Sequence, residues 1–141
     1  MRNIAIYKAT LDNEEIDQLK SVLQAKDDLS KVLEFEEKMV KYIGAKYAIA
    51  TATSTAALHL ALSSMRLKRG DKVLMSVNSF VNLPETVRHF DAEPIFVDIN
   101  LEDMNLDIEK FEETIIANKS KKLRAAIITF IGGLAPNLEK I

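Results

Sequence analysis

Residues 72–98 read KVLMSVNSFVNLPETVRHFDAEPIFVD. Two short apolar runs, at residues 72–76 and 94–98, flank a stretch over residues 82–90 that we interpret as a helix. A strand, a helix and a second strand of these lengths are typical of a βαβ unit with parallel strands. The runs are apolar almost throughout, as in strands that are covered on both faces of a sheet.

The same alternation continues on both sides of this unit. Further strands are expected at residues 47–50 and 125–130, and further helices at residues 55–65 and 108–117. The sequence therefore predicts an α/β fold with a mostly parallel sheet.

Two more helices are expected before the first strand. One covers residues 12–25, with Asp12 or Asn13 as its N-cap, because Ile16, Leu19, Val22 and Leu23 follow at helical spacing. The other begins with Ser30 as its cap and ends near residue 43, where Gly44 suits a left-handed C-terminal position.

Composition narrows the class of protein. The chain has 141 residues, 19 Lys and Arg against 21 Asp and Glu, a net charge of −2, and no cysteine. The charge balance argues against a nucleic-acid or membrane partner, and the missing cysteines exclude thiolate metal sites and disulfides. The N-terminal stretch becomes charged too early for a signal peptide, and no apolar run approaches the roughly 20 residues of a membrane helix. We therefore expect a cytoplasmic protein.

The most informative junction between a strand and a helix is ATATSTAAL, residues 50–58. In an open α/β sheet, ligands bind beyond the carboxyl ends of the strands, where free backbone N–H groups and the helix dipole attract phosphate or carboxylate. Thr53, Ser54 and Thr55 add hydroxyl groups, and the small residues after them allow close approach of an anion. The alternative is that Thr53 or Ser54 only caps the helix.

Other kinds of site have little support in the sequence. There is no G-x-G-x-x-G after a strand and no G-x-x-x-x-G-K-[ST], so the common dinucleotide and P-loop motifs are absent. His59 and His89 have no second ligand at a usable spacing, so no metal site is expected.

At this junction the chain closely resembles the DegT/DnrJ/EryC1/StrS aminotransferases, which are pyridoxal-phosphate (PLP) enzymes of nucleotide-sugar metabolism. The resemblance begins with Phe35-Glu36-Glu37 and Tyr42-Ile43-Gly44-Ala45-Lys46-Tyr47-Ala48-Ile49-Ala50, and continues with Thr53-Ser54-Thr55-Ala56-Ala57-Leu58-His59-Leu60-Ala61-Leu62. Further matches follow in order at residues 70–73, 78–81, 92–99, 104–107 and 125–133. The resemblance implies the N-terminal portion of the large domain of a fold type I aminotransferase, over residues 1–141, with no second domain.

The resemblance also implies roles for particular residues. Thr55 and Ala56 would bind the cofactor phosphate, with Ser54 in the slot where the family usually has glycine. Phe80 would stack on the pyridine ring. Tyr7 matches a region that lines the sugar site in some relatives. These residues form only half of a pyridoxal 5'-phosphate site.

The family's remaining catalytic groups have no counterpart in these 141 residues. The acidic partner of the pyridine nitrogen and the lysine that binds the cofactor covalently would lie beyond Ile141. We therefore expect a truncated or split aminotransferase chain that is inactive alone, although its family transfers an amino group from a donor to a nucleotide-linked keto sugar. The alternative is a non-catalytic binding or assembly protein that retains part of the fold.

The resemblance further implies a strand order. The strands expected at residues 94–98, 72–76 and 125–130 would pair in that order, and the strand at residues 47–50 would lack its partner. Unpaired strands favour a homo-oligomer or a complementary chain.

Overall fold

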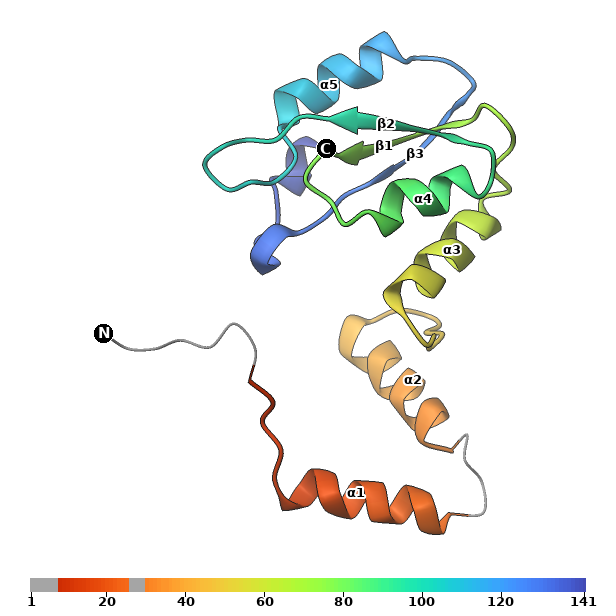
Figure 1. The fold of residues 1–141 in the computed structure, drawn as a ribbon, viewed down its shortest axis with the longest axis vertical. Coiled ribbons are helices and arrows are strands. Elements are labelled where there is room, and N and C mark those ends of the chain that lie inside the picture. Colours follow the sequence, from red (N-terminus) through yellow and green to blue (C-terminus); the bar gives the residue numbers. More distant parts are fainter. Residues whose placement is uncertain (1–7, 26–29) are drawn as a thin grey trace. The chain divides into compact units, whose positions relative to one another are not determined.

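A three-stranded parallel sheet organises the C-terminal two thirds of the chain in the computed structural model, which describes residues 8–25 and 30–141 (Figure 1). The chain divides into two units, Met1–Ala50 and Thr51–Ile141. The helices and strands, in chain order, are α1 (Asn13–Gln24), α2 (Ser30–Ile43), α3 (Ser54–Ser64), β1 (Lys72–Ser76), α4 (Asn82–Arg88), β2 (Glu93–Val97), α5 (Ile108–Ala117), β3 (Leu123–Ile127) and the short 3₁₀ turns η1 (Ile131–Gly133) and η2 (Leu138–Lys140).

The strand order is β2-β1-β3, and both pairings are parallel. The order implied by the family resemblance for these three strands is therefore confirmed. Strand β1 lies between the other two strands. It is the most buried of the three, since four of its five residues are inaccessible to solvent. The predicted limits of β3, residues 125–130, were too late by two or three residues. Strand β3 pairs along β1, from Lys72 with Leu123 to Met75 with Ile127, so its ladder ends one residue before the end of β1 at Ser76.

Helices cover both faces of this sheet. Figure 1 shows α5 on one side and α4 on the other. Side chains of β1 alternate between two apolar clusters. One cluster contains Val73 and Met75 with Leu62 of α3 and Val87 of α4, and the other contains Leu74, Val97, Leu106 and Phe111 of α5. The expected α/β architecture with a covered parallel sheet is confirmed.

In the N-terminal unit, the cap of α1 is Asp12. Its side chain accepts a hydrogen bond from the Glu14 backbone N–H at 2.8 Å, and the Glu15 carboxylate accepts one from the Asp12 N–H at 2.8 Å. This reciprocal pair satisfies two of the donors that a helix N-terminus leaves free. At the other end of the unit, Gly44 follows α2 with φ +73°, the left-handed geometry predicted for it.

The strand predicted at residues 47–50 is wrong. No strand pairing involves these residues in the described part of the chain, and Tyr47 and Ile49 are 74% and 77% exposed. An apolar run becomes a strand only when a neighbouring strand satisfies its backbone. Here the Ala50 N–H donates instead to the Glu36 carboxylate, at 2.7 Å.

Asp71 directly precedes β1, and its side chain stabilises the start of this strand. Its carboxylate accepts a hydrogen bond from the Lys68 backbone N–H at 2.9 Å and lies 3.5 Å from the Lys122 ammonium. The Lys68 hydrogen bond, followed by the charge and hydrogen bonding of Lys122, holds the pKa of Asp71 below its ordinary value of 3.8, against the opposing effect of burial.

This lowered pKa predicts a pH dependence of stability. A depressed folded-state pKa stabilises the fold above the ordinary aspartate pKa, and this contribution is lost as pH falls through the folded value. Asp71→Asn should therefore lower the free energy of unfolding at neutral pH, and its difference from wild type should shrink in acid. Urea unfolding at several pH values measures this difference, with the exposed Asp91→Asn as control. A difference that stays constant below pH 3.8 would contradict the assignment.

Candidate phosphate-binding site

The N-terminus of α3 has two backbone donors that are free. Thr53 caps the helix: its hydroxyl accepts a hydrogen bond from the Ala56 N–H at 3.1 Å, and its carbonyl accepts one from Ala57 at 3.1 Å. Among the hydrogen bonds of the described residues, none uses the N–H of Ser54 or Thr55. The capping alternative is thus confirmed for Thr53, and the two N–H groups beside it remain available to an anion.

The residues predicted to bind phosphate are adjacent on this helix end. Ser54 is exposed and begins the helix, whereas Thr55 and Ala56 are half-buried. Ser54 occupies a helical position without a positive φ, so its backbone does not require glycine there. The Ala56 N–H is committed to the Thr53 cap, which leaves its methyl group as its contribution to the site.

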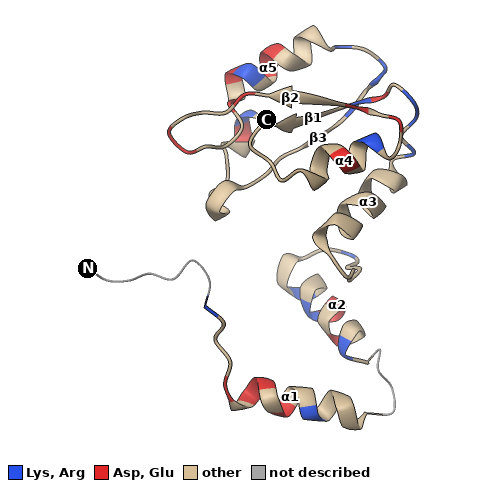
Figure 2. Cartoon of the chain, viewed as in Figure 1, with Lys and Arg blue, Asp and Glu red and all other residues tan. Residues whose placement is uncertain are grey.

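The composition of α3 itself is compatible with anion binding. Helix α3 carries no Asp, Glu, Lys or Arg, and Figure 2 shows it as a neutral segment. The positive end of an 11-residue helix dipole is therefore not opposed by a carboxylate on the same helix. Free N–H groups and hydroxyls are the donor types that a phosphate group needs.

A second helix contributes to the same place. The Asn82 side chain, in the first turn of α4, donates from Nδ2 to Thr55 Oγ1 at 2.6 Å. Its Oδ1 atom is buried and has no hydrogen-bond partner in the described structure. No local sequence pattern indicates this contact, because it joins residues 27 positions apart.

Phe80 lies in the loop that leaves the carboxyl end of β1. Its side chain is 73% exposed, so Phe80 is not part of the apolar core of this unit. Its backbone carbonyl accepts a hydrogen bond from Leu83, and the neighbouring Asn78 donates from Nδ2 to the Met104 carbonyl at 3.1 Å. The loop is thus fixed at both ends while its aromatic ring faces outward.

The segment after β3 is held by Asn105, which is 1% exposed. The Asn105 Oδ1 accepts a hydrogen bond from the Ile131 N–H at 3.0 Å, and its Nδ2 donates to the Leu134 carbonyl at 3.2 Å. Phe130 precedes this segment and is 48% exposed. Because the strands are parallel, this segment leaves the same edge of the sheet as the Phe80 loop.

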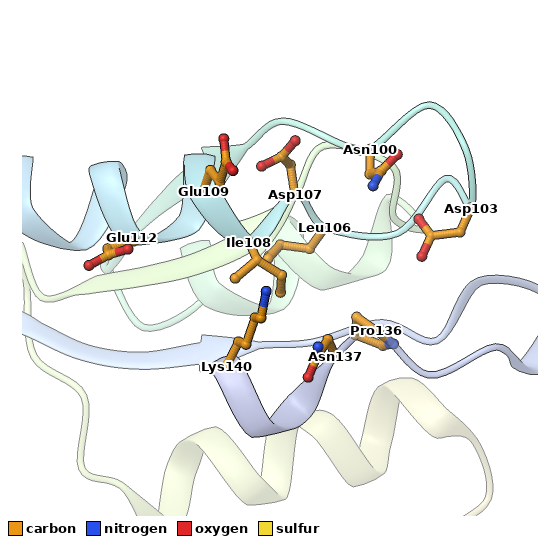
Figure 3. A pocket seen from close by; sticks show the side chains of 10 residues that line it. All are labelled: Asn100, Asp103, Leu106, Asp107, Ile108, Glu109, Glu112, Pro136, Asn137 and Lys140. Carbon is orange, nitrogen blue, oxygen red and sulfur yellow. The ribbon is translucent and has the colours of Figure 1, made fainter.

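A pocket of about 620 Å³ lies where the loop before α5 and the start of α5 meet the C-terminal segment (Figure 3). Figure 3 shows the Lys140 ammonium pointing toward Ile108 from across this pocket. Its other lining residues include four carboxylates, those of Asp103, Asp107, Glu109 and Glu112. Four negative charges against one ammonium disfavour a phosphate-bearing ligand here.

The remaining predicted residues do not add to this site. Tyr7 lies outside the described residues. The ring centroids of His59 and His89 lie 5.9 Å apart, and those of His59 and Phe90 lie 4.8 Å apart. Within residues 8–25 and 30–141 there is no group of three side chains suited to hold a metal ion, and no helix long and apolar enough to cross a membrane.

Solved structures share this fold. A DegT DnrJ EryC1 StrS aminotransferase from Brucella abortus superposes with a TM-score of 0.76 and 30% identity, over 91% of this chain and 35% of that chain. GDP-4-keto-6-deoxymannose-3-dehydratase, solved with a trapped PLP-glutamate geminal diamine, superposes with a TM-score of 0.87 and 24% identity, over 98% and 37% of the two chains. The fold is that of the N-terminal portion of the large domain of PLP-dependent aminotransferases.

The model of the DegT/DnrJ/EryC1/StrS aminotransferase family matches residues 9–141, and the chain belongs to this family. An uncharacterized protein of Methanocaldococcus jannaschii, MJ1066, is 39% identical over 103 residues, which are 73% of this chain and 26% of that protein. The spore coat polysaccharide biosynthesis protein SpsC of Bacillus subtilis is 32% identical over 79% of this chain and 28% of its own length. GDP-perosamine synthase of Vibrio cholerae is 26% identical over 98% of this chain and 37% of its length. The chain thus spans about a quarter to a third of these relatives.

Proposed function

We propose that this chain provides the phosphate-binding half of the cofactor site in a cytoplasmic PLP-dependent aminotransferase of nucleotide-sugar biosynthesis. The observation that carries the proposal is the N-terminus of α3, where the N–H groups of Ser54 and Thr55 are uncommitted. Ser54 and Thr55 would hold the phosphate group through these donors and their hydroxyls. Ala56 would allow its close approach, and the exposed Phe80 ring would cover the pyridine ring.

The residues of this chain would bind and orient the cofactor. When bound, pyridoxal 5'-phosphate supplies the electron sink that transfer of an amino group requires. The two backbone N–H groups at the positive end of α3 would stabilise the negative charge of the phosphate without a basic side chain and would fix this end of the molecule. The Phe80 ring would fix the plane of the other end and exclude water from one of its faces.

The proposed substrate class follows from the relatives. GDP-perosamine synthase of Caulobacter vibrioides and an aminotransferase of Pseudomonas aeruginosa named for UDP-2-acetamido-2-deoxy-3-oxo-D-glucuronate are 37% and 34% identical to this chain over 60% of its length. Both names contain a nucleotide. We accordingly propose a nucleotide-linked keto sugar and an amino donor as substrates, with Tyr7 near the sugar.

We propose that these 141 residues bind the cofactor but do not turn over substrate alone. None of their lysines matches the family's cofactor-binding lysine. We propose that residues 1–141 act as one part of a large domain and that they associate with a second copy or with a complementary chain.

Phosphate recognition is tested by comparing pyridoxal 5'-phosphate with pyridoxal, which lacks the phosphate. We expect the wild-type chain to bind the phosphorylated form on the order of a hundredfold more tightly, because several hydrogen bonds to a charged group contribute. Equilibrium dialysis measures both dissociation constants. Pyridoxal closes to a cyclic hemiacetal through its free 5'-hydroxyl and pyridoxal 5'-phosphate cannot, so their reactions with surface lysines differ. The same ratio is therefore also measured with pyridoxine 5'-phosphate and pyridoxine, which carry no aldehyde.

The variant for this test is Thr55→Val, which keeps the shape of the side chain and removes its hydroxyl. It should weaken binding of pyridoxal 5'-phosphate about tenfold and leave pyridoxal unchanged. Ser63→Ala, which removes an exposed hydroxyl near the other end of α3, is the control and should bind like wild type. Equal binding of the two compounds by the wild-type chain would refute the proposed site.

A further inference from the structure

The contact between Asn82 and Thr55 joins the first turns of two helices. Asn82 Nδ2 lies 2.6 Å from Thr55 Oγ1, and both side chains are half-buried. The backbone of Asn82 is itself held in α4, where its carbonyl accepts a hydrogen bond from the Thr86 hydroxyl at 2.6 Å. The Asn82 amide therefore approaches Thr55 from a fixed position.

This contact determines what the Thr55 hydroxyl can do. A threonine hydroxyl has one proton to donate and two lone pairs that accept. Because the Asn82 amide donates to the hydroxyl oxygen, the hydroxyl proton cannot point toward Nδ2. It remains available to an acceptor on another side, and a phosphate oxygen is an acceptor.

The other end of the Asn82 amide is also informative. Its Oδ1 atom is buried without a hydrogen-bond partner in the described structure. Asn105, by comparison, has both ends of its side-chain amide bonded. In the described structure the Asn82 side chain has only one hydrogen-bond partner, the Thr55 hydroxyl.

We propose that Asn82 is a positioning residue for phosphate binding, which orients the Thr55 hydroxyl so that its proton faces the phosphate group. This role rests on the proposed function. Asn82 acts through Thr55 and is not assigned a contact with the ligand. Its effect must therefore depend both on the phosphate and on the Thr55 hydroxyl.

The experiment is a double-mutant cycle on the full 141-residue chain, with pyridoxal 5'-phosphate and pyridoxal as the probes. Asn82→Ala should weaken binding of pyridoxal 5'-phosphate about fivefold and leave pyridoxal unchanged. In the Thr55→Val background the same substitution should have no further effect, because the hydroxyl it orients is gone. Asn118→Ala is the matched control, since Asn118 also makes side-chain hydrogen bonds but at the Lys72 end of the sheet.

Each result has a defined meaning. Equal losses from Asn82→Ala with and without the Thr55 hydroxyl, or an equal loss for pyridoxal, would show a general structural role and overturn the proposal. No loss at all would overturn it as well. A wild-type chain that does not distinguish the two probes refutes the phosphate site itself, and this failure is visible before any variant is made. Circular dichroism spectra of the variants confirm that each one folds.

Discussion

Replacement of Leu74 by alanine is expected to lower the free energy of unfolding of the sheet-containing unit by about 3 kcal/mol. Leu74 is 1% exposed at the centre of β1. Its side chain packs with Val97, Leu106 and Phe111, the cluster that joins the sheet to α5. Truncation loses the transfer free energy of the buried methyl groups. It also leaves a cavity, which cannot easily close because β1 is hydrogen-bonded to a strand on each side.

Leu101→Ala is the matched control because it makes the same chemical change at a side chain that is 78% exposed. It should alter stability by no more than about 0.5 kcal/mol. Tyrosine fluorescence does not report on this unit, since Tyr7, Tyr42 and Tyr47 are all in Met1–Ala50. Amide hydrogen exchange in β1 measures the opening free energy directly. Similar losses for the two variants would mean that the Leu74 cluster does not carry the stability of the sheet.

The βαβ units were predictable because their signals are local. Strand β1 has the predicted limits, residues 72–76, and so does α5, residues 108–117. In each case an apolar pattern of the right period stands between polar residues. Asp107 illustrates how a local signal sets a boundary: its side chain accepts a hydrogen bond from the Lys110 N–H and caps α5.

The segment at residues 47–50 is not a strand, and this could not be predicted from its own residues. Its apolar run has the composition of a buried strand, yet a strand requires a neighbour, and no apolar pattern supplies one. The family resemblance did signal the difficulty, because it pairs this strand with a segment other than β1, β2 or β3. The end of β3 was misplaced because Ile128 and Phe130 continue the apolar run, whereas the ladder with β1 ends at the pair of Met75 with Ile127.

The candidate site was only partly predictable, for the same reason. The N-terminus of α3 follows from a local pattern of strand end, hydroxyl residues and apolar helix, and the family resemblance assigned Phe80. Asn82 supports Thr55 over 27 positions in the sequence, and Asn105 holds the segment after β3 over 26 to 29 positions. Such contacts depend on how the elements pack, and a single asparagine in a loop or first turn does not indicate them.

The buried side chain of Asn105 leads to the second large expected effect. Asn105→Leu keeps a similar volume but leaves the Ile131 N–H and the Leu134 carbonyl without their partners. Asn105 is buried and Ile131 is half-buried, so the Ile131 N–H only partly regains water, whereas Leu134 is exposed; we expect a loss of about 2 kcal/mol in the free energy of unfolding. Asn137→Leu, at an exposed asparagine in the C-terminal segment, is the control and should change stability by no more than about 0.5 kcal/mol.

Asn105→Asp separates the two ends of this amide. The carboxylate still accepts from the Ile131 N–H, but it cannot donate to the Leu134 carbonyl, and burial raises the pKa of a carboxyl group at this position. A raised folded-state pKa means that the folded protein binds the proton more tightly than the unfolded chain. The destabilisation should therefore be greatest above the raised folded-state pKa and should shrink as pH falls toward the ordinary aspartate pKa, where the protonated acid can donate to Leu134. Hydrogen exchange in β1 and urea unfolding across this pH range measure the change. If Asn105→Asp is as stable as wild type at neutral pH, the Nδ2 contact does not hold the segment after β3, and the bond from Ile131 suffices.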